Sequence, residues 1–232
     1  LYSVADVLIL SGGYWYNEDI LKASGIESVP ENWDEFQIMC DQIGEWALEE
    51  ESEVKALKPS GEGYLYCMDH MLAGSEKSRV EGHNIIFQDK SFSDSIDRMK
   101  RMYNSSISEN AKYSYRDETK LFNEGKLAIY INGVWGAPMI SKQINAKYAL
   151  LPTDKGESMS CISSSLGYVL GNSGNEEKEK AAVKFLKYML SKKVQTQILE
   201  KTEQIPANPD ISLESYKENK SRLYQAATLV LD

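Results

Sequence analysis

Trp135 is the residue whose type and position best suit binding chemistry. It follows Leu127 to Ile131, an apolar run typical of a strand, and the Asn132-Gly133 pair, which is typical of a turn. Side chains beyond the strand ends of an open α/β sheet project into the crevice where such sheets bind ligands. A flat indole there can stack on the C–H face of a sugar ring, while hydrogen-bonding groups at the rim take the hydroxyls. The alternative is a half-buried Trp that only packs.

Few other residues offer material for catalysis or metal binding. The only histidines are His70 and His83, which leaves little for a metal site or a nucleophile–His pair. Cys40, Cys67 and Cys161 are odd in number, far apart and without a CxxC pair, so neither a zinc ribbon nor a disulfide framework is indicated. We interpret all three cysteines as small buried side chains, and we expect no metal, cofactor or catalytic residue.

Composition and charge exclude several classes of partner. The chain has 232 residues and a net charge of -9, with a pI of about 4.9 and a mean hydropathy of -0.44. A negative average field repels phosphate backbones, which makes a nucleic acid an unsuitable partner. No apolar run reaches the roughly 18 to 20 residues that span a bilayer.

The elements that must position these side chains alternate along the chain. Expected strands cover 4–10, 14–16, 127–131 and 168–170. Expected helices cover 17–25, 32–47, 92–103, 115–124 and 176–190. The polar segments 51–63 and 153–167 are expected to be loops. Alternating strands and helices indicate the α/β class. The apolar ends of the sequence lead us to expect an excised piece of a longer protein.

Three motifs, in this order, carry more information than periodicity. The first is Tyr16-Asn17-Glu18-Asp19-Ile20-Leu21 followed by Asn32-Trp33-Asp34-Glu35-Phe36. The second is Leu121-Phe122-Asn123-Glu124-Gly125-Lys126 followed by Ala128-Ile129-Tyr130-Ile131-Asn132-Gly133-Val134-Trp135. The third is Gly167-Tyr168-Val169-Leu170, the helix from Ala182 to Leu190, and Ile205-Pro206-Ala207-Asn208. Together they resemble the family-1 extracellular solute-binding proteins, the substrate-binding subunits of sugar ABC transporters.

The resemblance implies a periplasmic-binding-protein-like (type II) fold. Its two α/β lobes are joined by crossing strands, and the ligand lies in the cleft between them. Residues 1–165 would form a crossing strand and the C-terminal lobe. Residues 166–210 would be a returning segment of the N-terminal lobe, and 211–232 would start the closing C-terminal helices.

The resemblance also supplies candidate ligand-binding residues. It implies that Trp135 stacks on sugar and that Tyr115 is a cleft residue, although Tyr115 could equally be a packing residue. Ser11 and Gly12 would lie where the crossing strand passes the cleft floor, where small residues let a ligand approach the backbone. The glycine pair lacks the spacing of a phosphate-binding loop. Asp69 falls in a region of variable ligand contacts, and a helix cap is its alternative role.

Three functions are compatible with the residues. The leading hypothesis is a monomer outside the cytoplasmic membrane, tethered by a lipidated N-terminus that precedes this chain, which binds an oligosaccharide and delivers it to ABC permease subunits. The second keeps the fold with a non-sugar solute such as a polyamine. The third is a glycoside hydrolase, which needs two carboxylates flanking one bond. Asp117 and Glu118 are simpler to explain as acids at a helix start.

Overall fold

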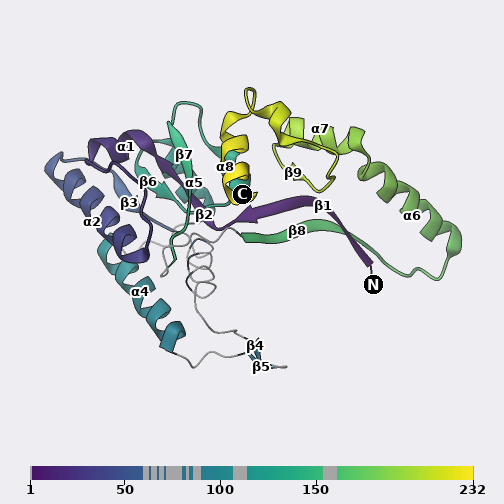
Figure 1. Ribbon diagram of the computed structural model, residues 1–232, viewed down its shortest axis with the longest axis horizontal. Helices are drawn as coiled ribbons and strands as arrows, with labels where there is room; N and C mark the ends of the chain where they lie inside the picture. Colours follow the sequence, from purple (N-terminus) through teal and green to yellow (C-terminus); the bar gives the residue numbers. More distant parts are fainter. Residues whose placement is uncertain are drawn as a thin grey trace. The chain divides into compact units, whose positions relative to one another are not determined.

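The computed structural model describes residues 2–59, 63, 67, 71, 80–81, 84–85, 90–106, 114–153 and 161–231 (Figure 1). The chain forms two compact units, each assembled from segments distant in sequence. Unit 1 contains Leu1–Ser11, Gly133–Pro138 and Cys161–Asp232, and unit 2 contains Gly12–Asn132 and Met139–Ser160. The main chain therefore first passes from unit 1 to unit 2 between Ser11 and Gly12.

Unit 2 is built on a four-stranded sheet with the order β3-β6-β2-β7. The strands are β2 (Gly13–Asn17), β3 (Lys55–Leu57), β6 (Leu127–Tyr130) and β7 (Ala146–Leu150). Strand β2 runs antiparallel to both β6 and β7, and β3 runs parallel to β6. Every residue of β6 is buried, as expected for an inner strand that is covered on both faces.

The described helices of unit 2 are α1 (Glu18–Ala23), α2 (Trp33–Glu49), α4 (Lys90–Ser106) and α5 (Tyr115–Asn123). A two-stranded ribbon of β4 (Val80–Glu81) and β5 (Asn84–Ile85) precedes α4. Helix α2 begins after Asn32, whose side-chain oxygen accepts a hydrogen bond from the backbone nitrogen of Glu35 at 2.9 Å. This cap satisfies a backbone donor that the helix leaves unpaired, which explains why α2 starts there.

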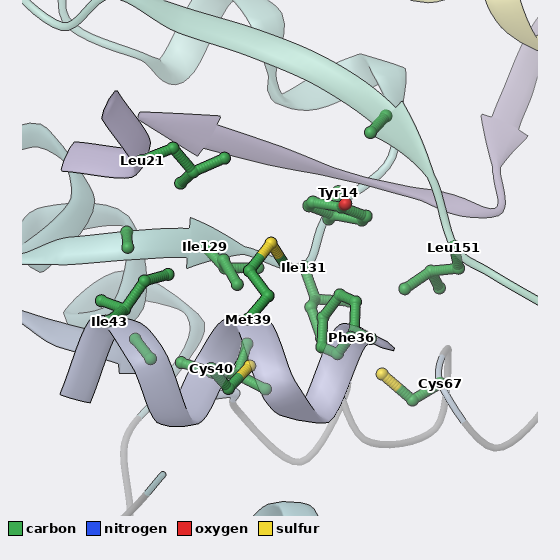
Figure 2. Close-up of a cluster of buried hydrophobic side chains, with 14 of the residues drawn as sticks. Tyr14, Leu21, Phe36, Met39, Cys40, Ile43, Cys67, Ile129, Ile131 and Leu151 are labelled. Atoms are coloured by element: carbon green, nitrogen blue, oxygen red, sulfur yellow. The ribbon is translucent and has the colours of Figure 1, made fainter. Parts of the chain in front are cut away.

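The inner face of α2 forms one side of the unit 2 core. Figure 2 shows Phe36, Met39, Cys40 and Ile43 on this helix beside Tyr14 and Ile129 of the sheet and Ile131, which follows β6. These four positions follow the three- and four-residue spacing that puts side chains on one helix face. Because the sheet and α2 both bury apolar side chains at this contact, the two elements hold each other in place.

Unit 1 contains a three-stranded sheet with the order β8-β1-β9. Strand β1 (Tyr2–Ser11) lies antiparallel beside β8 (Cys161–Leu170) over nearly its whole length (Figure 1). The short β9 (Ile205–Pro206) pairs with the other side of β1. Unit 1 also contains α6 (Glu176–Met189), α7 (Lys192–Thr202), η2 (Leu213–Tyr216), α8 (Ser221–Leu231) and most of η1 (Val134–Met139). No helix in the described part of the chain is long and apolar enough to cross a bilayer.

Most sequence predictions about secondary structure are confirmed. The α/β class, the strands at 4–10, 14–16 and 127–131, and all five predicted helices are present within a few residues of their expected bounds. Cys40 and Cys67 are buried free thiols, whereas the side chain of Cys161 lies outside the described ones.

Two predicted loops are wrong in part. The segment 51–63 contains strand β3, and the stretch 153–167 contains the first seven residues of β8. Both segments lack the apolar alternation that identifies a strand from sequence, because β3 has only three residues and β8 contains the run Ser163-Ser164-Ser165. Backbone pairing with β6 and β1 makes them strands nonetheless.

Helix α6 differs from its prediction in burial. Its sequence is amphipathic, yet none of its residues is buried in the structure. Phe185 makes an edge-on contact with Tyr168 of β8, with ring centroids 6.2 Å apart, and still remains exposed.

Candidate ligand-binding site

Tyr115 is held at the first position of α5 by a cap at Ser114. The Ser114 hydroxyl accepts a hydrogen bond from the backbone nitrogen of Asp117 at 3.3 Å, and the Asp117 carboxylate accepts one from the backbone nitrogen of Ser114 at 3.0 Å. This reciprocal capping box fixes where the helix begins. The Ser114 hydroxyl also donates to the Asp117 carboxylate at 2.7 Å, and this hydrogen bond, together with the one from the Ser114 backbone nitrogen, lowers the pKa of Asp117 from its usual value. Asp117 is therefore a helix-start residue, as the sequence predicted.

Asn132 connects Tyr115 to the sheet. It lies two residues beyond β6 and is 1% exposed. Its side-chain nitrogen donates one hydrogen bond to the hydroxyl of Tyr115 at 2.9 Å and another to the hydroxyl of Tyr130 at 2.8 Å. An amide nitrogen carries two protons and accepts none. Both phenol oxygens must therefore act as acceptors toward Asn132, and each phenol proton points elsewhere.

The proton of Tyr130 is directed to Thr119. The two hydroxyl oxygens lie 2.7 Å apart. Thr119 donates its own proton to the backbone oxygen of Tyr115 at 2.8 Å, so it must accept the proton of Tyr130. Burial raises the pKa of Tyr130 far above its usual value, which keeps this phenol protonated and the chain of hydrogen bonds intact.

The proton of Tyr115 has a weaker acceptor. Its hydroxyl donates to the thioether sulfur of Met139 at 3.1 Å, and a thioether accepts hydrogen bonds poorly. Asn123 holds Met139 in place. The Asn123 side chain donates to the backbone oxygen of Met139 at 2.9 Å and accepts from the backbone nitrogen of Ser141 at 2.7 Å. The Tyr115 hydroxyl is thus a donor in a fixed position, and a ligand oxygen could replace the Met139 sulfur as the acceptor of its proton.

A surface hollow opens beside Tyr115. Three lining residues, Tyr115, Thr119 and Asn123, are four positions apart and share one face of α5. The other lining residues are Arg116, Lys120, Glu124 and Met139. Sequence reasoning found Tyr115 but missed Thr119, Asn123 and Met139 and saw Asn132 only as a turn residue. The four-residue spacing was a signal that could have found the first two.

Trp135 lies in η1 (Val134–Met139) and is neither sealed in the interior nor fully exposed. The six-membered ring of its indole covers the backbone of Gly133 so closely that a β-carbon at this glycine would come within 1.9 Å of it. Real β-carbons do not approach other atoms so closely, so the observed indole position requires glycine at 133. The glycine of the predicted Asn-Gly turn therefore also provides the space that the indole of Trp135 occupies.

The other predicted site residues fall in different parts of the structure. Ser11 ends β1 and is 6% exposed, and Gly12 follows it with a φ of 96°, a conformation that favours glycine. Trp135 and Ser11 belong to unit 1, whereas Tyr115 and Gly12 belong to unit 2. Asp69 lies outside the described residues.

The acids named for the hydrolase hypothesis do not form a carboxylate pair beside the hollow. The Asp117 carboxylate is engaged in the cap, and Glu118 is completely buried. Among the residues that the structure describes, no group of three His, Cys, Asp or Glu side chains could hold a metal ion.

Comparison with known proteins identifies what the chain is similar to. The family model described as "Bacterial extracellular solute-binding protein" matches residues 7–224. A solved Streptococcus pneumoniae solute-binding protein in complex with the blood group A-trisaccharide shares 27% sequence identity and a TM-score of 0.81, covering 100% of this chain and 60% of that one. No curated protein sequence matches the chain significantly.

Two more distant structures share the same fold. A chitin oligosaccharide binding protein has 18% identity and a TM-score of 0.77, covering 98% of this chain and 59% of that one. The maltose-bound MalE3 of T. maritima has 17% identity and a TM-score of 0.73, covering 98% of this chain and 61% of that one. The fold is therefore the periplasmic-binding-protein-like fold that the sequence predicted, and the chain spans about 60% of the length of these structures.

Proposed function

The chain belongs to the bacterial extracellular solute-binding proteins, and from this premise we propose that it binds a carbohydrate, an oligosaccharide above all, for delivery to an ABC importer. The ligands of three similar structures are the blood group A-trisaccharide, a chitin oligosaccharide and maltose. Family and neighbours are binding proteins, and we propose that this protein likewise makes and breaks no covalent bond.

The observation that carries the proposal is the directed donor at Tyr115. The phenol oxygen of Tyr115 accepts a hydrogen bond from the Asn132 side chain. Its proton therefore points toward Met139, and on that side the phenol acts as a donor. A sugar hydroxyl oxygen accepts such a proton better than a thioether does. Because Asn132 and Asn123 already fix the geometry, little conformational freedom is lost when a ligand replaces the sulfur.

The hollow beside Tyr115 favours a neutral ligand over a cation such as a polyamine. Its charged lining residues are Arg116 and Lys120 against the single acid Glu124. A polycation would meet more positive than negative charge there, whereas sugar hydroxyls are neutral and can use the phenol, hydroxyl and amide groups of the same helix face.

We propose that ligand binding closes two lobes around the sugar. A ligand that contacts both lobes at once stabilises the closed state over the open one. In this mechanism Trp135 would supply a stacking surface and Tyr115 a proton donor. Ser11, Gly12 and Asp69 as further contacts, and the lobe boundaries at 1–165, 166–210 and 211–232, stay predictions.

The proposed partners are the membrane subunits of an importer, which places the protein outside the cytoplasmic membrane. Family membership supports this location. The monomeric state and the attachment through a lipidated N-terminus stay predictions.

Thermal unfolding with a panel of sugars tests the function. We expect a di- or oligosaccharide to raise the unfolding temperature of the intact protein, because a ligand specific for the native state stabilises it by mass action. At a ligand concentration of about 100 times Kd the gain is about 2.7 kcal/mol. Spermidine and simple anions serve as controls. A shift with spermidine and none with any sugar would replace the carbohydrate proposal by the polyamine alternative.

Tyr115→Phe tests the donor. This variant keeps the ring and removes the hydroxyl with its proton, so we expect the affinity for the sugar found in the panel to fall by about 5- to 10-fold, the value of one hydrogen bond. Isothermal titration calorimetry measures the change. The matched control is Tyr188→Phe on α6, where the side chain is exposed and lies outside the candidate site. Equal affinity of Tyr115→Phe and the wild type would remove Tyr115 from the site.

A further inference from the structure

The net charge of the chain is concentrated in one segment. Residues 23–54 contain ten acidic and no basic residues, so the other 200 residues contain 25 acidic and 26 basic residues and are close to neutral. All ten acids are exposed in the structure. They are Glu27, Glu31, Asp34, Glu35, Asp41, Glu45, Glu49, Glu50, Glu51 and Glu53. The segment comprises helix α2 with the loops before and after it.

Large apolar side chains lie among these acids. On the outer face of α2, opposite the core contacts seen in Figure 2, Ile38 is 62% exposed and Leu48 is 81% exposed. Asp41 and Glu45 lie between them at three- and four-residue spacing on the same helix face. Ile38 lines one shallow surface hollow and Leu48 lines another. We call this face, made of Ile38, Asp41, Glu45, Leu48 and Glu49, the outer face of α2.

The arrangement is unfavourable for the isolated helix. The C-terminal end of a helix carries partial negative charge and is stabilised by cations. The last turn of α2 has no basic residue, and Glu49 is followed by Glu50 and Glu51. Asp41, Glu45 and Glu49 also succeed one another at four-residue spacing, where like charges repel. Helix α2 therefore contains no basic residue that could stabilise its C-terminal end or neutralise its acidic side chains.

Little neutralisation comes from the rest of the described chain. Across the described residues only two of the ten acids form ion pairs. Asp34 lies 3.7 Å from Arg98, and Glu53 lies 2.7 Å from Lys126. Lys55, the first basic residue after Lys22, lines the hollow that contains Leu48. The carboxylates between Ile38 and Leu48 thus face solvent without a positive partner among the described side chains.

We propose that the outer face of α2 is a docking surface for a protein partner that presents Lys or Arg side chains next to apolar ones. Basic side chains complement the carboxylates and the helix C-terminus, and apolar side chains cover Ile38 and Leu48. Membranes and nucleic acids present phosphates, which this face repels. In the described residues no acid cluster has the geometry of a metal site, which argues against a bare cation as the occupant. The docking surface shares no residue with the candidate carbohydrate site.

Calorimetry with a synthetic 18-residue peptide of Leu and Lys, arranged to form a basic amphipathic helix, tests the proposal on the intact protein. Two double variants probe the face, Asp41→Asn with Glu45→Gln and Ile38→Gln with Leu48→Gln. We expect each to weaken binding by about 10-fold or more, and binding of the wild type to weaken as salt rises. All four positions are exposed, so we expect both variants to keep the circular dichroism spectrum and unfolding temperature of the wild type, or to gain stability.

Matched controls separate docking from general attraction between opposite charges. Glu176→Gln with Glu177→Gln removes two exposed acids from α6 instead and should leave the affinity within about twofold of the wild type. A Lys and Gln peptide of equal charge should bind about 10-fold more weakly, because it offers nothing to Ile38 and Leu48. Equal losses in the α6 and α2 variants, or equal binding of the two peptides, would overturn the proposal.

Discussion

Replacing Trp135 by alanine is expected to remove most of the sugar affinity of the intact protein. The indole is half-buried in η1, and its six-membered ring lies against Gly133. Aromatic anchors that are held rigidly dominate binding energies, and truncating one commonly costs about 2 kcal/mol or more, which is about 30-fold in Kd. Calorimetric titration of the sugar identified by thermal shift measures the loss. Trp135→Phe, which keeps a smaller flat ring, should recover part of it.

Gly133→Ala provides a more demanding version of the same test. This variant leaves the indole in the protein but places a β-carbon where its six-membered ring lies. We expect the ring to rotate away, with an affinity between those of the wild type and Trp135→Ala. If Trp135→Ala retains wild-type affinity, the stacking role is wrong, and a lowered unfolding temperature of the same variant would identify Trp135 as a packing residue.

The features of the fold that could be predicted from sequence are those that a short segment determines by itself. Helix α2 has a capping residue at Asn32 and apolar positions at helical spacing, and both signals are local. Strands β3 and β8 depend on neighbours instead. Lys55 pairs with β6 more than 70 residues away, and the serines of β8 pair with β1 more than 150 residues away. No property of these segments alone identifies them as strands.

The candidate site shows the same division. Tyr115 and Trp135 could be proposed from the motifs around them, because their types and places suit a ligand. The role of Asn132 could not, since it depends on α5 lying beside the end of β6, so that one amide reaches the hydroxyls of Tyr115 and Tyr130. Met139 likewise enters the site only because Asn123 fixes its backbone. The structure thus adds the residues that orient the ones found from sequence.

The second large effect is expected for stability rather than binding. Phe36 is completely buried in unit 2. It contacts Tyr14 edge-on at 5.4 Å between ring centroids and Trp33 at 5.5 Å. Truncating a buried Phe to alanine removes its transfer free energy and leaves a cavity, which together cost about 3 to 5 kcal/mol. We expect Phe36→Ala to lower the free energy of unfolding by this amount, as measured by urea denaturation of the intact protein followed by circular dichroism.

Ile38→Ala on the same helix is the matched control, because Ile38 points away from the core and is mostly exposed. Its effect on the unfolding free energy should stay within about 0.5 kcal/mol. If the free energy of unfolding lies near the lower end of the usual range of about 5 to 15 kcal/mol, Phe36→Ala would be marginally folded, whereas Ile38→Ala would fold normally and lose only affinity for a docking partner. Similar losses of stability in both variants would mean that α2 does not pack on the sheet through Phe36. The inner face of α2, which includes Phe36, therefore stabilises unit 2, whereas the outer face, which includes Ile38, is available to a docking partner.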